Sequence, residues 1–333
     1  MTTTHTVLLA ARPDGLPDPA TFRLVEHSIP EPAAGQVLIR NLYMSLDPGM
    51  LMLIGDYPGI PMPPYMIGEP LTGDTVGEVV ASRVPSVPVG ALVRHRLGWR
   101  EHAVATSAEV RVVPHDRFPS PSGHLGFGLV AYAGLTAVAG MRPGDTVYVS
   151  SAAGATGSLA GQIARLLGAG RVVGSVGSAA KVAHARDVLG YDAVFDYHDG
   201  LLPNLRAAAP AGIDVYFDLV GGDHLRAAIE VMNPGGRIAL CGALTRQHAG
   251  GTPDGGPGDL LPVIGKRLTL RGFSAFDHLD LAPEYEALLR NWLADGAIVQ
   301  HETVIDGLAQ APGALLDLVR GRHLGKTVVR LTR

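Results

Sequence analysis

Residues 144–181 restrict the possible folds of this chain more than any other stretch of the sequence. Val147 and Val149 lie in a short run of β-branched and aromatic residues, which is typical of a buried strand. A turn of small residues follows at 152–157, then a helical pattern with apolar residues on one face, and then a second predicted strand at 171–176. Strand, glycine turn, helix and strand form the βαβ unit that binds dinucleotides.

The glycines of this turn have specific physical roles in such a unit. Gly154 lets the backbone approach a pyrophosphate closely, and Gly157 removes a Cβ where the helix meets the strand. The first N–H groups of a helix have no helical acceptor, so they can face the phosphates. The motif departs from G-x-G-x-x-G at its first position, which is Ala152, and an ordinary tight turn is the alternative interpretation.

An acidic residue is missing where NAD-binding folds usually carry one. Such folds place an Asp or Glu about 20 residues after the motif, where it bonds the ribose 2′-OH. Here residues 146–186 contain no Asp or Glu, and Ser178 and Lys181 follow the second predicted strand. A hydroxyl and a cation fit a 2′-phosphate, so the sequence predicts NADP(H) as cofactor. A solvated helix residue is the other interpretation of Lys181, which is one of only three lysines.

The composition argues against several classes of function. The 333 residues can form two domains, and the net charge of −4 comes without a block of like charge, which argues against a nucleic-acid surface. A single cysteine, Cys241, excludes an intramolecular disulfide and a cysteine-rich metal cluster. The first residues lack the basic start and apolar core of a signal peptide, and the uncharged stretches 125–141 and 146–164 do not read as one spanning helix. We therefore expect a soluble cytoplasmic protein.

The remaining pattern divides the chain into two kinds of region. Residues 1 to about 120 read as β-rich and are punctuated by Pro and Gly, which suits a small antiparallel barrel-like domain; strands are predicted at 6–10, 22–26, 36–43, 73–84, 92–96 and 101–105. From residue 124 helices and strands alternate: helices are predicted at 126–140, 182–189, 225–232, 260–266 and 283–294, strands at 193–196, 213–220, 237–241 and 268–273, a turn at 234–236 and a loop at 250–258. The segments 299–305, 312–320 and 327–331 can return to the first domain.

Several motifs together resemble the zinc-free medium-chain dehydrogenases/reductases. Within them the chain is similar to the branch of prostaglandin reductases, leukotriene B4 dehydrogenases and alkenal/one double-bond reductases. The resemblance covers nearly the whole chain; its carriers are SLDP at 45–48, GLTA at 134–137, AAGATGS at 152–158, VGSVGS at 173–178 with Lys181, YFDLVGG at 216–222, GRIALCGA at 236–243 and LGKTVV at 324–329.

The resemblance implies an α/β protein with two domains. A GroES-like, β-rich catalytic domain is expected at 1–123 and 299–333, and a doubly wound Rossmann domain that binds NADP(H) at 124–298. It also implies a homodimer built through the Rossmann sheets, a small-molecule substrate, and hydride transfer to the β-carbon of an α,β-unsaturated carbonyl. A quinone reductase of the same fold, a non-redox enzyme such as a cyclase, and a nucleotide-binding regulator without turnover are the alternatives.

The family's cofactor residues carry over by position in its motifs. The pyrophosphate is expected at Ala155, Thr156, Gly157 and Ser158, and the 2′-phosphate at Ser178, Lys181 and Tyr197. The nicotinamide end is expected at Cys241, Gly242, Ala243, Phe273, Ser274, Ala275 and His323.

Four positions near the expected active site depart from the family pattern. The tyrosine of Asp-Pro-Tyr-Met is Gly49, the tyrosine shortly after Cys-Gly-Ala is Gln247, the asparagine before Leu-Gly-Lys is His323, and the asparagine of Asp-Asn-Val-Gly-Gly is Leu219. In the family the two tyrosines shape the substrate site and support the enolate oxygen. Their loss puts the substrate class and the proton donor in doubt and leaves the cofactor assignment intact.

The proton donor is therefore open. Candidate donors are Tyr65, Tyr57, Tyr43, His95, Gln247, His248 and His278, among which we assign Tyr65 and Gln247 as the catalytic candidates, with plain packing as the alternative for each. No metal is expected. The family's zinc-dependent relatives carry Gly-His-Glu where this chain has Gly68-Glu69, and its thirteen histidines are scattered without a metal-ligand spacing.

Overall fold

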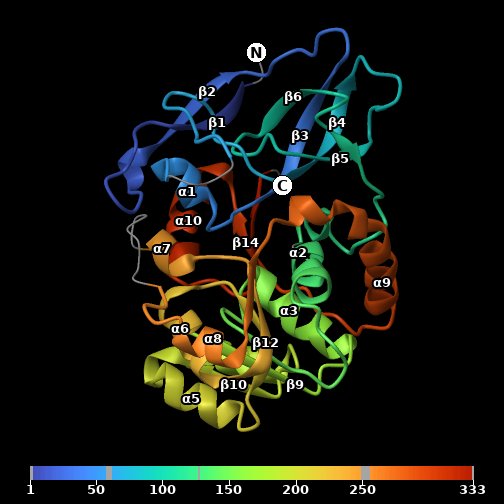
Figure 1. Cartoon of the computed structure of the whole chain (residues 1–333). Helices are drawn as coiled ribbons and strands as arrows, with labels where there is room; N and C mark the ends of the chain where they lie inside the picture. Colours follow the sequence, from blue (N-terminus) through green and yellow to red (C-terminus); the bar gives the residue numbers. More distant parts are fainter. Residues whose placement is uncertain (1–2, 58–61, 127, 249–255, 332–333) are drawn as a thin grey trace. The chain divides into compact units, whose positions relative to one another are not determined.

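A computed structural model describes residues 3–57, 62–126, 128–248 and 256–331. The chain divides into two compact units, whose elements are labelled in Figure 1. Unit 1 comprises Met1–Gly126 and Glu302–Arg333, and unit 2 comprises Phe127–His301. The limits predicted from the sequence are 1–123 with 299–333 and 124–298, and the roles assigned to these two regions stay predictions.

Unit 1 is the β-rich unit. Its elements are β1 (Thr3–Leu9), η1 (Pro19–Thr21), β2 (Phe22–Ser28), β3 (Gln36–Ser45), α1 (Met50–Gly55), β4 (Thr75–Ser82), β5 (Leu92–His95), β6 (His102–Thr106), β7 (Arg111–Val112), η2 (Pro121–Leu125), β14 (Glu302–Asp306), η6 (Leu308–Gln310), α10 (Ala311–Val319) and β15 (Lys326–Arg330). β1 and β2 form an antiparallel pair, and a larger sheet runs in the order β14-β15-β3-β4-β5-β7, with β6 on β3. The predicted return of the last residues to this unit therefore takes the form of β15 pairing antiparallel with β3.

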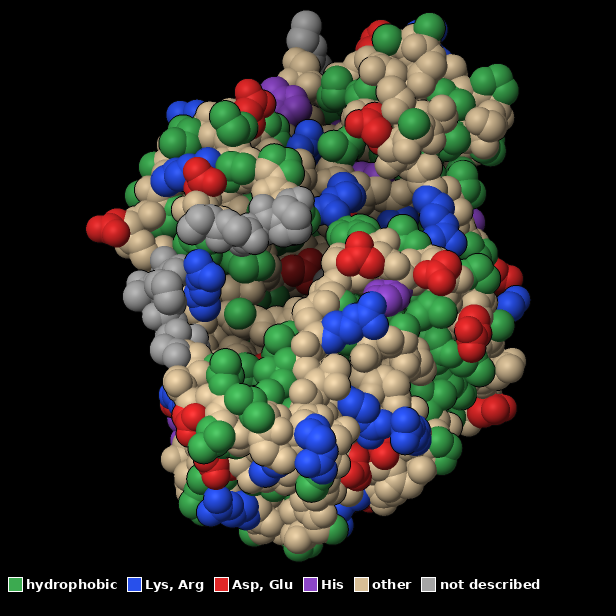
Figure 2. All heavy atoms as spheres, in the orientation of Figure 1, with side chains coloured by type: hydrophobic (Ala, Val, Ile, Leu, Met, Phe, Trp, Pro, Cys, Tyr) green, Lys and Arg blue, Asp and Glu red, His purple; other side chains and the backbone are tan. Residues whose placement is uncertain are grey.

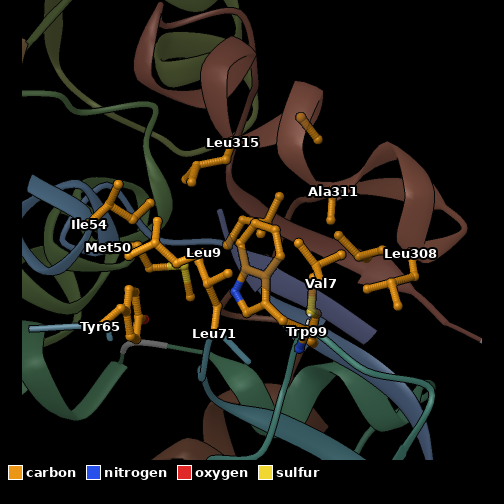
Figure 3. Close-up of a cluster of buried hydrophobic side chains, with 14 of the residues drawn as sticks. Val7, Leu9, Met50, Ile54, Tyr65, Leu71, Trp99, Leu308, Ala311 and Leu315 are labelled. Atoms are coloured by element: carbon orange, nitrogen blue, oxygen red, sulfur yellow. Dashed lines mark hydrogen bonds between the residues drawn. The ribbon is translucent and has the colours of Figure 1, made fainter. Parts of the chain in front are cut away.

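An apolar cluster fills the space between β1, α1 and α10 in unit 1. Figure 3 shows Trp99 among Val7, Leu71 and Leu315 in this cluster. The Trp99 side chain is fully buried and stacks on Phe22, with 5.9 Å between the ring centroids. Burial of such large side chains is the main stabilising contribution to a β-rich unit of this size.

Unit 2 is the doubly wound unit. Its elements are α2 (Gly128–Ala133), η3 (Gly134–Val138), β8 (Thr146–Val149), α3 (Ala155–Leu166), β9 (Arg171–Val176), α4 (Ala179–Asp187), β10 (Ala193–Asp196), η4 (Tyr197–Asp199), α5 (Leu201–Ala208), β11 (Ile213–Asp218), α6 (Gly222–Val231), β12 (Met232–Leu240), α7 (Leu244–His248), α8 (Leu261–Lys266), β13 (Thr269–Gly272), η5 (Ala275–Leu281) and α9 (Ala282–Ala294). The sheet is parallel in the order β10-β9-β8-β11-β12-β13. This order reverses direction between β8 and β11, as in the Rossmann fold, and confirms the predicted fold class.

Helices cover both faces of the unit 2 sheet. α5, α6 and α8 contact one another in series, and α2 contacts both α3 and α9, so the helices form two groups (Figure 1). The central strands between them consist of buried residues such as Val147, Val173 and Phe217. Because the sheet is buried on both faces, its strands read in the sequence as apolar runs without alternation.

Two predictions about local structure differ from the structure, and three short helices were not predicted. The helix predicted at 126–140 leaves α geometry after Ala133 and continues as a π-helical turn over Gly134–Val138. The turn predicted at 234–236 is wrong, because β12 runs through it and bulges between its pairs Met232–Ile213 and Arg237–Val215. Gly235 makes this bulge possible, since its φ of 78° lies in the left-handed region. The short helices α1, α5 and α7 were not predicted, and part of the predicted loop 250–258 lies outside the described residues.

Two features of the chain bear on whether it could contact a membrane or a highly charged partner. No helix in the described part of the chain is long and apolar enough to cross a bilayer. On the face shown in Figure 2, basic and acidic side chains are interspersed.

Candidate functional site

The turn between β8 and α3 is shaped by close backbone contacts. Gly157 lies so near this turn that a Cβ at its position would stand 2.2 Å from the backbone oxygen of Ser151. Ser151 itself adopts a positive φ of 53°, a strained conformation for a residue other than glycine. α3 therefore begins directly against the end of β8, and only glycine fits at position 157.

The first turn of α3 offers free backbone donors. Gly154 is the N-cap residue and gives no side-chain hydrogen bond, and the first helical bond runs from the Ser158 N–H to the Gly154 oxygen at 2.9 Å. The N–H groups of Ala155, Thr156 and Gly157 therefore have no acceptor within the helix, and this turn contains no acidic residue. Such a helix start attracts an anion through its N–H groups and its dipole. The residues present thus fit a diphosphate.

A second group of predicted residues gathers at the ends of β9 and β10. The Ser178 hydroxyl accepts a hydrogen bond from the Lys181 N–H at 3.4 Å and caps α4. The Tyr197 ring lies over Gly177, where an added Cβ would stand 3.0 Å from the ring. Partial burial lowers the pKa of the Lys181 ammonium. Ser178 and the Tyr197 ring thus border Gly177, and Lys181 lies on the first turn of α4, where a 2′-phosphate needs donors and a ribose diol needs a carboxylate.

A buried carboxyl group ties the end of β11 to the end of β8. One oxygen of Asp218 accepts hydrogen bonds from the Tyr216 hydroxyl at 2.7 Å, the Gly221 N–H at 2.8 Å and the Val220 N–H at 2.9 Å. The Ser150 hydroxyl oxygen accepts from the Leu219 N–H at 2.9 Å. Burial raises the pKa of Asp218. Sequence reasoning missed this network, although its residues at 216–222 were recognised as a family motif.

The run Cys241–Ala243 lies beside the turn that follows β11. The N–H groups of Cys241 and Gly242 donate to the backbone oxygen of Asp218 at 2.9 and 3.0 Å. A Cβ on Gly242 would stand 2.7 Å from the Leu219 oxygen, so glycine is required here as well. Burial raises the pKa of the Cys241 thiol to about 12, which disfavours the reactive thiolate.

Phe273, Ser274 and Ala275 follow β13 at the same edge of the sheet. The Phe273 ring meets Phe217 edge-on, with 6.3 Å between centroids, and both rings pack on Gly134. The Ser274 hydroxyl accepts from the Phe276 N–H at 3.3 Å and caps η5. The structure therefore brings the thirteen cofactor residues predicted in unit 2 to the carboxyl ends of its parallel strands, which is where ligands bind in open α/β sheets.

The two catalytic candidates lie in different units. Tyr65, in unit 1, donates its hydroxyl proton to the Thr72 oxygen at 2.6 Å, and burial raises its pKa to about 12. Its ring lies beside Met50 in the apolar cluster of Figure 3. Gln247, in unit 2, is buried at the end of α7. Its backbone N–H donates a hydrogen bond to the backbone oxygen of Ala243 at 3.1 Å. Their assignment as catalytic residues stays a prediction.

The other unit 1 positions singled out by the sequence have defined local roles. Gly49 is the N-cap residue of α1 with φ −57° and ψ −23°, values open to any residue. His323 Nδ1 lies 3.1 Å from the Thr327 hydroxyl. Burial lowers the pKa of His95 to about 4, and its Nδ1 accepts from the Leu97 N–H at 3.0 Å, so His95 is neutral and engaged near neutral pH.

Sequence reasoning also missed a buried ion pair in unit 1. The Lys326 ammonium donates to Asp47 at 2.5 Å and to the Ser45 hydroxyl, and Ser45 donates to the second Asp47 oxygen at 2.5 Å. Lys326 is buried, and this burial lowers its pKa. The two motifs SLDP and LGK, far apart in the sequence, are joined by this pair. Within the described residues, no three His, Cys, Asp or Glu side chains are grouped as a metal site would need.

Comparisons with known proteins match both halves of the chain. A family described as the N-terminal domain of oxidoreductase matches residues 5–113, and one described as zinc-binding dehydrogenase matches residues 155–293. The chain is 37% identical to an NADPH-dependent curcumin reductase of Escherichia coli (strain K12), over 97% of this chain and 96% of that protein. It is 36% identical to an NADP(+)-dependent 2-alkenal reductase of Nicotiana tabacum, over 93% and 91%, and 36% identical to prostaglandin reductase 1 of Mus musculus, over 95% and 96%. The crystal structure of CurA in complex with NADPH from Vibrio vulnificus has a TM-score of 0.92 and 35% identity, over 99% of each chain.

Proposed function

This chain belongs to the zinc-free medium-chain dehydrogenases/reductases, and from that membership we propose that it is an NADPH-dependent ene-reductase acting on α,β-unsaturated carbonyl compounds. It is an NADP-dependent oxidoreductase of the group that contains the curcumin, alkenal and prostaglandin reductases. The reduction of an enone double bond and the choice of substrate are the proposed part. The observation that carries the proposal most directly is the placement of Ser178 and Lys181 at the start of α4, beside the Tyr197 ring, with no Asp or Glu in residues 146–186. The Asp196 carboxylate next to Tyr197 is engaged with His198.

The residues at the carboxyl edge of unit 2 would each hold one part of the cofactor. Ala155, Thr156, Gly157 and Ser158 would bind the diphosphate through the start of α3, and Ser178, Lys181 and Tyr197 would bind the 2′-phosphate. Cys241–Ala243 and Phe273–Ala275 would face the nicotinamide. The same role for His323, which lies in unit 1, is carried over from the family motif alone. When bound, NADPH supplies a hydride to the β-carbon of the substrate, while water or a side chain supplies a proton to the α-carbon.

The protein's part in this reaction is orientation and charge stabilisation. Negative charge develops on the carbonyl oxygen during the reduction, and donors fixed beforehand stabilise it best. Gln247 and Tyr65 are the proposed donors. The Tyr65 proton is shared with the Thr72 carbonyl, which favours a side-chain amide of Gln247 over this phenol.

The test of the reaction follows the hydride itself. Purified protein is incubated with NADPH deuterated at C4 and a panel of enones, enals and quinones, and the products are analysed by mass spectrometry and NMR. We expect NADPH oxidation and one deuterium at the β-carbon of the enone. Consumption of NADPH with quinones only would support the quinone-reductase alternative, and no consumption with any acceptor would support a cyclase or a regulator.

The cofactor assignment is tested by removing one cation. Lys181→Ala should raise the dissociation constant of NADPH about tenfold or more, because a charge-assisted contact to phosphate contributes about 1.5–3 kcal/mol. NADH binding should change little. Lys266→Ala is the matched control, since Lys266 caps α6 by donating to the Ile229 and Glu230 oxygens. Equal changes for both cofactors in Lys181→Ala would contradict the assignment.

The substrate is proposed to be bulkier than a short alkenal. Gly49 and Gln247 replace two tyrosines of the family pattern, and a buried aromatic ring removes about 150–250 Å² of surface from water. Contacts with remote parts of a cyclic or polyketide-like enone would then orient its β-carbon. Gln247→Tyr should improve kcat/KM for a short enal relative to a bulky enone. If the wild type already prefers the short enal and the variant leaves the ratio unchanged, this substrate class is wrong and the reductase proposal stands.

A homodimer formed through unit 2 is part of the proposal. β13 ends the sheet, and within the described residues no strand pairs with its outer side. Leu261 and Ile264, on the neighbouring α8, are each 69% exposed, and exposed apolar groups beside an open strand favour association. Light scattering should give twice the chain mass, and Leu261→Glu with Ile264→Glu should shift it toward the monomer. A wild-type monomer would contradict this proposal.

A cytoplasmic location stays an expectation from the sequence.

A further inference from the structure

Three polar side chains form a buried triad inside unit 2 that the proposed function does not use. The Tyr148 hydroxyl of β8 lies 2.8 Å from the Ser175 hydroxyl of β9 and 3.1 Å from Nδ1 of His224 on α6. Ser175 lies 3.3 Å from the same nitrogen. Tyr148 and Ser175 are fully buried, and His224 is 6% exposed. Buried polar groups are costly unless they are paired, so this triad fixes the His224 ring relative to two strands of the sheet.

The fixed imidazole meets the tyrosine that we assign to the 2′-phosphate. The ring centroids of His224 and Tyr197 are 5.1 Å apart and the rings stand edge-to-face at 73°. His198 packs on Tyr197 with centroids 4.1 Å apart, and its Nδ1 lies 2.8 Å from an Asp196 oxygen. Gly177 borders the Tyr197 ring as well. The ring thus has neighbours on several sides, of which His224 is the one joined to the buried sheet.

Tyr197 is the exposed member of this assembly. The residue is 39% exposed, and no described group of the chain hydrogen-bonds to its hydroxyl. A phenol held in one orientation loses less conformational freedom when it binds a phosphate oxygen than one that turns freely. Its position next to Ser178 and Lys181 is fixed through Gly177 on one side and His224 on another.

We propose that His224, held by Tyr148 and Ser175, is a positioning residue for Tyr197 and thereby a determinant of the preference for NADPH over NADH. The inference rests on the proposed function and adds a residue that the cofactor does not touch. Burial lowers the pKa of His224 to about 4, so the imidazole is neutral at physiological pH. Its contribution is therefore the orientation of Tyr197, whereas Lys181 provides the charge.

The test is a double-mutant cycle on cofactor affinity. Dissociation constants of NADPH and NADH are measured by fluorescence titration for the wild type, His224→Ala, Tyr197→Ala and the double variant. We expect His224→Ala to raise the dissociation constant of NADPH about fivefold and that of NADH less than twofold. A loss of this size is expected when one contacting side chain becomes free to turn and must be immobilised on binding. In the Tyr197→Ala background, His224→Ala should leave the NADPH-to-NADH ratio unchanged, because the side chain it positions is absent.

Two further variants separate positioning from a general effect on folding. Tyr148→Phe removes only the hydroxyl that contacts His224 and should reproduce part of the loss of NADPH affinity. If His224→Ala does not fold, Tyr148→Phe replaces it in the test. His184→Ala is the matched control, since this half-buried histidine on α4 pairs with His301, with centroids 4.8 Å apart, and should not change the ratio. The melting temperature of each variant is recorded beside its affinities.

The outcomes distinguish this inference from the function it rests on. A wild type without preference for NADPH would overturn both. If Tyr197→Ala loses the preference and neither His224→Ala nor Tyr148→Phe changes it, only the role of His224 is wrong. Equal weakening of NADPH and NADH by His224→Ala, or an undiminished effect in the Tyr197→Ala background, would also overturn it.

Discussion

Unit 1 fixes the turn after β3 with opposite charges, whereas unit 2 fixes the turns after β8, β11 and β12 with close backbone contacts and hydroxyl groups. In unit 1 the Lys326 ammonium is buried against Asp47 and Ser45. In unit 2 the buried carboxyl of Asp218 has no described cation at ion-pair distance and accepts from hydroxyl and N–H donors instead. The turn before α3 depends on the missing Cβ of Gly157.

The difference teaches which kind of change each unit tolerates. A buried charge loses its partner when one side chain is removed, so unit 1 is sensitive to deletions of charge. Glycine contacts leave no room for one more carbon atom, so unit 2 is sensitive to added volume. These two sets of turns should therefore respond to different substitutions, although unit 1 also contains crowded glycines such as Gly77 and unit 2 also contains a largely buried ion pair, Asp145 with Arg237.

Breaking the buried ion pair should have the largest effect. Lys326→Met leaves the Asp47 carboxylate without its cation. Loss of one partner of a fully buried pair costs about 3–5 kcal/mol, and because the Asp47 side chain is 23% exposed we expect the lower end of this range. Because the chain has two tryptophans, Trp99 in unit 1 and Trp292 in unit 2, the variant is made in a Trp292→Phe background, where fluorescence during urea unfolding reports on unit 1. Adding Asp47→Leu should restore much of the loss. A change below about 1 kcal/mol would show that the pair does not stabilise unit 1.

Acid should weaken both units, because each contains a deeply buried histidine whose pKa is strongly lowered. Burial lowers the pKa of His95 in unit 1 and of His224 in unit 2 from 6.5 to about 4. Between these pH values the unfolded chain binds protons that the folded chain does not, so stability falls as the pH decreases from 6.5 to 4 and is unaffected above 6.5. The loss should reach about 3 kcal/mol for each histidine.

The acid effect is measured as the free energy of unfolding at pH 7, 5.5 and 4.5. His95→Gln and His224→Gln should each flatten the dependence on pH. Hydrogen exchange resolves the two units. A variant whose pH dependence matches the wild type would show that its histidine is protonated equally in the folded and unfolded chain.

Adding one methyl group in unit 2 should have the next largest effect. In Gly157→Ala the new Cβ would collide with the Ser151 backbone oxygen, and overpacking of this kind costs about 1–3 kcal/mol. The displaced start of α3 should also weaken NADPH binding. Gly265→Ala in α8 is the control, since nothing lies within 4 Å of its Cβ position and alanine favours a helix by up to about 1 kcal/mol. Identical stability of both variants would contradict the volume argument for unit 2.

Prolonged chelation comes last in this order, because it should change neither the activity of the protein nor the stability of either unit. The described residues hold no cluster suited to a metal, and both units are stabilised by the charges and contacts named above. Activity and melting temperature should be unchanged after treatment with EDTA and 1,10-phenanthroline, and elemental analysis should show no stoichiometric zinc. A bound zinc ion whose removal abolishes turnover would contradict the prediction that both units work without a metal.

The sequence predicted those features that depend on local pattern. The strands of unit 2 are apolar runs because both faces of its sheet are buried, and the glycines at 154 and 157 mark the turn before α3. Ser178 and Lys181 could be proposed for a 2′-phosphate because the sequence shows directly that residues 146–186 contain no Asp or Glu. The doubly wound sheet and the turn before α3 were therefore predicted, whereas the assignment of single residues to parts of the cofactor stays a prediction.

Features that depend on distant pairing could not be predicted. Lys326 and Ser45 are 281 residues apart, and nothing near either residue indicates the other. The triad of Tyr148, Ser175 and His224 combines three elements, and each residue alone reads as an ordinary core or helix position. The bulge in β12 was missed because Pro-Gly-Gly indicates a turn, while pairing with β11 on both sides continues the strand.

The pairing of β15 with β3 also sets an order for biosynthesis. Unit 2 is one continuous segment, so its sheet can assemble as soon as residue 301 has left the ribosome. Unit 1 must wait until Lys326 is synthesised, since only then can Asp47 gain its cation and α10 cover the cluster around Trp99. During that interval residues 43–45 at the end of β3 lack the partner strand that β15 provides. Unit 1, whose synthesis begins first, can therefore complete its sheet only after the whole of unit 2 has been synthesised.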